Sequence, residues 1–96
     1  MYKLYHYSTL IGVVTSAEAN GMSMHGLIEM TEVAHVFNPV FAFMRNNDAT
    51  EADEAAIDPD NLEHWYISNE QGERTQIGPP GIFDKDGKKH ILWRFL

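Results

Sequence analysis

The chain has 96 residues, 44% of them hydrophobic, which suits one globular domain with one core. It contains no cysteine, and this excludes a disulfide scaffold, a thiolate metal site and a cysteine nucleophile. Fourteen acidic residues against seven basic ones give a formal net charge of -7, which argues against binding to nucleic-acid phosphates or to an anionic membrane.

Strand-forming residues dominate the start of the chain. Residues 3–14 are rich in Tyr, Leu, Ile and Val, which favour an extended conformation. Ser8, Thr9 and Gly12 indicate a bend or bulge within this stretch. Residues 17–21 end in Asn-Gly, a dipeptide typical of tight hairpin turns, so a turn is expected there.

The next segment alternates between apolar and polar side chains over residues 22–30. A period of two predicts a strand with one buried face. The strand is expected to continue through residues 31–37, with a bulge near residues 32–34 where the alternation fails.

Residues 39–46 fit either a helix or a strand. Asn38 followed by Pro39 is typical of a helix start, because proline suits the first helical position. The residues that follow, among them Val40 and Phe41, favour a strand, which is the preferred interpretation.

Residues 48–63 contain seven acidic residues and no Lys or Arg, whereas acids and bases cancel in the rest of the chain. Alanines within this segment favour a short helix. Asp48 fits the N-cap of that helix, with Glu51 completing a capping box at the third helical position. Asp58 and Pro59 are expected to end it.

The last third of the chain predicts further strands. Residues 65–68 and 73–77 form one expected hairpin. The Gly-Pro-Pro-Gly sequence at 78–81 interrupts pairing, since neither proline donates a backbone hydrogen bond. A turn at 84–87 then precedes residues 89–96, in which apolar and polar side chains alternate.

These elements predict one domain over residues 1–96, mainly β, with an antiparallel β-roll or barrel-like fold and one short acidic helix inserted at about 48–63. The alternative is an α+β fold in which the helix packs on a curved antiparallel sheet. Neither a signal-peptide pattern nor a long apolar run is visible, so we expect a soluble cytoplasmic protein without a membrane partner.

No motif selects a cofactor or a metal, and none is predicted. The five histidines never recur at a spacing of two, three or four, the spacings at which neighbouring side chains share a metal ion. Residues 84–87 resemble the start of a calcium loop, but the ligand positions that should follow are not occupied by suitable residues. Phosphate-binding glycine motifs and a nucleophile elbow are also missing. Whether the protein is an enzyme stays uncertain, with the balance against it.

The leading hypothesis is a small non-enzymatic interaction protein, of the accessory type that phages and mobile elements encode. It would bind a protein partner through the acidic segment or through strand edges. On a helix, Glu51, Glu54 and Asp58 share one face and Asp48 lies one turn before, so these four are the candidate partner-binding residues. The ordinary alternative is that they form a solvated helix face.

The apolar tail and the exposed strand edges favour a homodimer. Direct binding to nucleic acid is not expected, because no basic stripe is visible.

Two other functions remain open. A barrel-like binder of an apolar or aromatic ligand would use Met22, Met24, Trp65 and Trp93, and it requires a cavity of a few hundred Å³. An acid-base or metal-assisted hydrolase would need titratable side chains that converge in a cleft, and the sequence alone identifies no catalytic residue.

Overall fold

The computed structural model describes residues 1–96, with the exception of the side chain of Asn20. Within this described part the strands are β1 (Tyr2–His6), β2 (Thr9–Asn20), β3 (Ser23–Met30), β4 (Trp65–Ser68), β5 (Arg74–Ile77), β6 (Gly81–Lys85) and β7 (Lys88–Arg94). Between β3 and β4 lie a 3-10 helix, η1 (Glu32–Phe37), and the helices α1 (Asn38–Arg45), α2 (Glu51–Ala55) and α3 (Pro59–Leu62).

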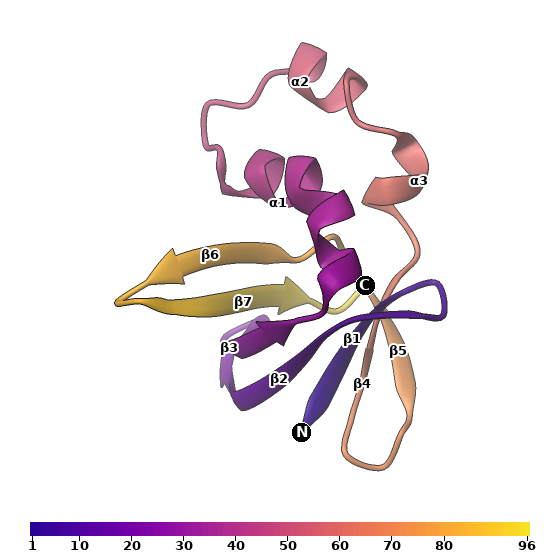
Figure 1. Cartoon of the computed structure of the whole chain (residues 1–96), viewed down its shortest axis with the longest axis vertical. Helices are drawn as coiled ribbons and strands as arrows, with labels where there is room; N and C mark the ends of the chain where they lie inside the picture. Colours follow the sequence, from indigo (N-terminus) through magenta and orange to yellow (C-terminus); the bar gives the residue numbers. More distant parts are fainter.

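The described strands form one antiparallel sheet in the order β5-β4-β1-β2-β3-β7-β6. The helices lie together on one side of the rolled sheet, and α2 lies farthest from it (Figure 1). This arrangement confirms the predicted mainly β, antiparallel fold.

The sheet rolls up without closing into a barrel. Its two outermost strands, β5 and β6, are joined by residues 78–80 alone, so the two ends of the sheet must lie close together. A single bridge pairs Ile77 with Phe95, and the Gly78 amide donates to the Arg94 carbonyl at 3.2 Å. Prolines follow at once, and because they lack an N–H group the pairing cannot continue.

The bend expected near Ser8 is a chain reversal, with Tyr7 and Ser8 connecting β1 to β2. The expected irregularity at Gly12 is a bulge, because the register between β1 and β2 shifts and leaves Ile11 as the extra residue. A Cβ atom at Gly12 would lie 2.7 Å from the Cδ1 atom of Ile28, so a larger residue here would force β3 or the Ile28 side chain to shift.

Two predictions about the following segments are wrong. β2 runs on to residue 20 through a bulge between Thr15 and Glu18, so the turn starts later than expected. Residues 31–37 do not continue the strand with a bulge, because Glu32–Phe37 is a 3-10 helix with Thr31 as its N-cap. Ala34 and Phe37 are its buried residues, and their spacing of three matches one 3-10 turn.

The preferred strand interpretation of residues 39–46 is also wrong, because Asn38–Arg45 is helix α1. The proline lies in the first helical turn, as the alternative interpretation required. Val40 and Phe41 are the buried residues of this helix. Their packing against the sheet outweighs their intrinsic preference for strands.

The acidic segment forms two short helices instead of one. The N-cap of α2 is Thr50, whose hydroxyl accepts from the Asp53 amide at 3.3 Å, while the Asp53 carboxylate accepts from the Thr50 amide at 2.9 Å. The predicted capping box therefore exists two residues later than expected, and Asp48 is not its cap. Asp58 does not simply end a helix, since it is the N-cap of α3.

The core lies between the inner face of the sheet and the η1–α1 layer. Its largest fully buried side chains are Trp65, Trp93, Phe41, Leu4, Ile11, Ile77 and Ile91. In the described residues, no helix is long and apolar enough to cross a membrane.

Candidate functional site

The four predicted partner-binding residues are all exposed, but they do not share one helix face. Asp48 lies in the turn before α2, and Glu51 and Glu54 lie on α2 itself. Asp58 caps α3, where its carboxylate accepts from the Asp60 amide at 3.0 Å. The structure therefore places the four residues on one stretch of chain, residues 48–63, which we call the acidic appendage.

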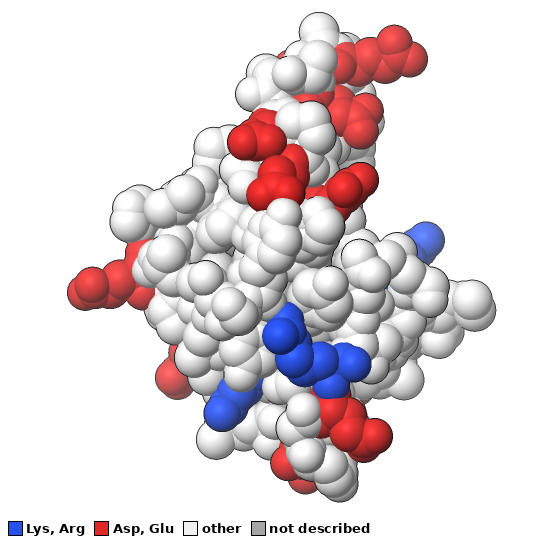
Figure 2. All heavy atoms as spheres, turned by 90° about the vertical axis from the view of Figure 1, so that its right-hand side faces the viewer, with Lys and Arg blue, Asp and Glu red and all other residues white. Residues whose placement is uncertain are grey.

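The appendage extends away from the sheet. All of α2 is described, and none of its side chains is buried. Ile57, which is 8% exposed, and the half-buried Leu62 connect the appendage to the core. Acidic side chains gather at this end of the molecule, whereas most of the Lys and Arg side chains on the same face lie lower, over the sheet (Figure 2). The negative charge is thus concentrated on a projecting part of the surface.

The turn between β1 and β2 brings Tyr7 to the base of the appendage. The Tyr7 hydroxyl donates a hydrogen bond to the Asp60 carboxylate. The Tyr7 ring stacks on the imidazole of His64, with 4.4 Å between ring centroids and 17° between planes. We call these three residues the Tyr7 cluster.

The backbone of the Tyr7 cluster is strained at two positions. Tyr7 has φ +54° and His64 has φ +66°, a left-handed conformation that costs a residue with a side chain about 1 to 3 kcal/mol. The backbones of Tyr7 and His64 are in direct contact, since the Tyr7 amide donates to the His64 carbonyl at 2.9 Å. Ring stacking and this backbone hydrogen bond hold both residues in place.

Two carboxylates lie beside His64 in the cluster. His64 Nε2 lies 3.5 Å from Asp60 Oδ1 and 3.8 Å from Glu63 Oε2. The hydrogen bond to Asp60 raises the pKa of the Tyr7 hydroxyl to about 12, with smaller contributions from lost hydration and from the Asp60 and Glu63 charges. Tyr7 therefore remains a neutral hydrogen-bond donor throughout the physiological pH range.

Buried groups fix the position of Asp60. His6, 6% exposed, donates from Nε2 to the Asp60 carbonyl at 2.9 Å. The His6 ring lies 4.7 Å from the ring centroid of Phe37 and 4.9 Å from that of Trp65. Trp65 Nε1 in turn donates to the Asn61 carbonyl at 2.9 Å. Two core side chains thus attach α3 to the sheet.

Arg74 borders the cluster on its other side. Its guanidinium carbon lies 4.9 Å from the ring centroid of Tyr5 and 4.5 Å from that of Tyr66, and the guanidinium donates to the Tyr7 carbonyl. These two tyrosines are paired directly across β1 and β4, so they present their rings side by side. A shallow depression of about 440 Å³ is lined by Tyr7, Ser8, Tyr66 and Arg74.

The four predicted ligand-binding residues do not line a common cavity among the described residues. Met24 and Trp93 are paired across β3 and β7. Met22 lies in the turn before β3 and is 90% exposed, and Trp65 packs with Phe37 and other core residues from β4. Both tryptophans are core residues in this fold.

Four exposed apolar side chains surround a separate groove of about 370 Å³ near the C-terminal strand: Met44, Leu92, Phe95 and Leu96. The homodimer expected from the sequence stays a prediction.

Sequence reasoning did not identify the Tyr7 cluster, because its members are far apart in the chain. Tyr7 and Asp60 are separated by 53 residues. Tyr7 lies in the turn after β1, and Asp60 and His64 become its neighbours only because β1 pairs with β4.

In the described part of the chain, no group of three or more His, Asp or Glu side chains is arranged to hold a metal ion. No protein-family model, curated protein or solved structure matches this chain.

Proposed function

We propose that this protein is a non-enzymatic binding protein that recognises a Lys- or Arg-rich segment of a partner protein. The binding face would consist of the acidic appendage and the Tyr7 cluster. The observation that carries the proposal is their contact: a segment with seven acids and no base is fixed through Asp60 against Tyr7, an aromatic residue 45% exposed.

Two kinds of attraction would act on a basic side chain at this place. The carboxylates of the appendage attract cations over about a Debye length, roughly 8 to 10 Å at physiological ionic strength. A guanidinium or ammonium group over a tyrosine ring adds about 0.5 to 1 kcal/mol at an exposed site. Arg74 is an internal example of this second contact, since it lies over Tyr5 and Tyr66.

The alternative is that the acids only keep the protein hydrated. In that case any binding to a basic peptide would depend on total charge and not on which acids are present. The proposal instead requires that the appendage and Tyr7 contribute more than other exposed groups do.

Fluorescence anisotropy with a labelled octa-arginine peptide separates these alternatives. We expect Glu51→Gln with Glu54→Gln to weaken binding by about fivefold or more, and Tyr7→Ala alone to weaken it by about two- to fivefold. The matched control is Glu18→Gln with Glu29→Gln, which removes the same charge from exposed positions on β2 and β3. Equal weakening by the two double variants, or no binding to the unaltered protein at low salt, would overturn the proposal.

A further inference from the structure

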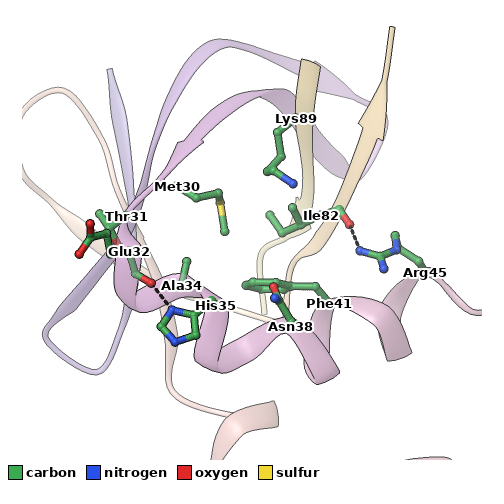
Figure 3. A pocket seen from close by; sticks show the side chains of 10 residues that line it. All are labelled: Met30, Thr31, Glu32, Ala34, His35, Asn38, Phe41, Arg45, Ile82 and Lys89. Atoms are coloured by element: carbon green, nitrogen blue, oxygen red, sulfur yellow. Dashed lines mark hydrogen bonds between the residues drawn. The ribbon is translucent and has the colours of Figure 1, made fainter. Parts of the chain in front are cut away.

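A second concave site lies between the η1–α1 layer and the sheet, outside the acidic appendage (Figure 3). It has a volume of about 310 Å³. We call it the helix groove, and its lining residues are Met30, Thr31, Glu32, Ala34, His35, Asn38, Phe41, Arg45, Ile82 and Lys89. A volume of roughly 300 Å³ is at the lower end of the range of small-molecule sites.

The floor of the helix groove is apolar. Phe41 and Ile82 are each 2% exposed, and Ala34 and the half-buried Met30 adjoin them. The four side chains come from α1, β6, η1 and β3, so the floor is formed by the packing of the helices on the sheet. Because the core fixes these residues, the floor exists before any ligand arrives.

Two cationic side chains reach the same part of the groove. Arg45, at the end of α1, donates from its guanidinium to the Ile82 carbonyl at 3.0 Å. Lys89 extends from β7 toward the groove. Figure 3 shows that the cationic groups of Arg45 and Lys89 approach Ile82 from different directions. Lys89 Nζ also lies 3.1 Å from Asp84 Oδ1, an exposed ion pair of the kind that contributes little stability.

The acidic and titratable groups of the lining lie at the opposite end. Figure 3 shows Glu32 and His35 away from Arg45 and Lys89, with the Glu32 carboxylate pointing out of the groove. His35 Nδ1 donates to the Glu32 carbonyl, which holds its ring at that end. The groove thus combines an apolar floor with an end that carries Arg45 and the Lys89–Asp84 ion pair, although the chain as a whole carries a net charge of -7.

From this arrangement we propose that the helix groove binds a small carboxylic acid with an apolar body. The carboxylate lies between Arg45 and Lys89, and the apolar body covers Phe41 and Met30. An arginine fixed by one hydrogen bond keeps further N–H groups for a carboxylate, and such charge-assisted bonds are about twice as strong as neutral ones. This site shares no residue with the acidic appendage or the Tyr7 cluster, so it is independent of the proposed recognition of a basic partner.

Titration with sodium octanoate, followed by amide chemical shifts, tests the site. We expect saturable shifts at Met30, Phe41 and Ile82 in the unaltered protein. Arg45→Gln combined with Lys89→Gln is expected to weaken octanoate binding by roughly tenfold or more, because two charge-assisted contacts are lost. Binding of 1-octanol, which lacks the charge, is expected to be weak and insensitive to this change.

The matched control is Lys85→Gln combined with Lys88→Gln, which removes the same charge at the β6–β7 turn. It is expected to leave octanoate binding within about twofold of the unaltered protein, as exposed charges outside a site act weakly. The charge-preserving variant Lys89→Arg is expected to retain octanoate binding. That result would show that the fold tolerates a substitution at position 89. Shifts that do not saturate, equal affinity for octanoate and 1-octanol, or equal losses in the two double variants would overturn the proposal.

Discussion

The hydroxyl of Tyr7 and the carboxylate of Asp60 form a hydrogen bond between residues 53 positions apart in the chain. This contact joins the turn between β1 and β2 to the base of the acidic appendage. Because His6 binds the Asp60 carbonyl at the same time, the sheet holds Asp60 through both its backbone and its side chain. The appendage is therefore fixed at this end, while α2 remains exposed.

The first prediction concerns the pKa of Tyr7, which the bond to Asp60 raises from 10.0 to about 12. A group whose pKa is higher in the folded state than in the unfolded state contributes its full stabilisation at pH values below its unfolded-state pKa. That stabilisation is lost as the pH rises from 10 through about 12. A spectrophotometric tyrosinate titration is expected to show a component that ionises near pH 12.

The variant Asp60→Asn removes the charge that holds this proton, and the last ionisation is expected to move down toward 10, the ordinary tyrosine value. Tyr2→Phe serves as the control and is expected to leave the last ionisation in place. If all tyrosines of the unaltered protein ionised together, the hydrogen bond would not exist in solution.

A second prediction distinguishes the actual helix cap from the one suggested by the sequence. Thr50→Ala removes the hydroxyl that accepts from the Asp53 amide, and N-cap losses cost about 0.5 to 2 kcal/mol. Because α2 is exposed, this cost is expected to appear as faster hydrogen exchange of α2 amides and not as a large change in global stability.

Asp48→Ala is the comparison, since Asp48 lies two residues before the cap and makes no capping contact in the described structure. It is expected to leave exchange in α2 unchanged. Faster exchange in Asp48→Ala than in Thr50→Ala would place the cap at Asp48.

Elements that depend on a local sequence pattern were predicted correctly. Period-two alternation identified β3, and the turn before β7 followed from its Asp-Gly sequence. Helix α1 was assigned wrongly because Val40 and Phe41 have strand propensity, yet the fold buries them on a helix. Packing against the sheet decided the conformation, and this information is not contained in a local window.

The site was less predictable than the fold for the same reason. A charge count identified the acidic segment, but it treated Asp60 as one acid among seven. Its contacts with Tyr7 and His6 depend on how β1 pairs with β4, which is a long-range property. Arg74 reaches Tyr7 from β5 in the same way, so no spacing of residues could reveal the depression.

A third prediction tests the bulge in β2. Gly12→Ala places a methyl group 2.7 Å from Ile28 Cδ1 and 3.0 Å from the Glu29 carbonyl oxygen. Overpacking of this kind costs about 1 to 3 kcal/mol, measured as a lower midpoint of denaturant unfolding. Gly81→Ala is the control, because the nearest atom would lie 3.9 Å away, and it is expected to change stability little.

The last prediction tests whether His6 attaches the appendage to the sheet. His6→Phe keeps an aromatic ring beside Phe37 and Trp65 but removes the donor to the Asp60 carbonyl. A partly buried carbonyl left without its partner costs about 1 to 3 kcal/mol, so the thermal midpoint is expected to fall. Hydrogen exchange of the α3 amides is expected to become faster. Exchange of the β3 and β7 amides is expected to change only as much as the lower global stability requires. The control His25→Phe changes a half-buried histidine on β3, which is paired with Glu18 of β2 and Leu92 of β7. If the two variants changed α3 exchange equally, the attachment would have to come from the Trp65–Asn61 and Tyr7–Asp60 hydrogen bonds and from the packing of Ile57 and Leu62 instead.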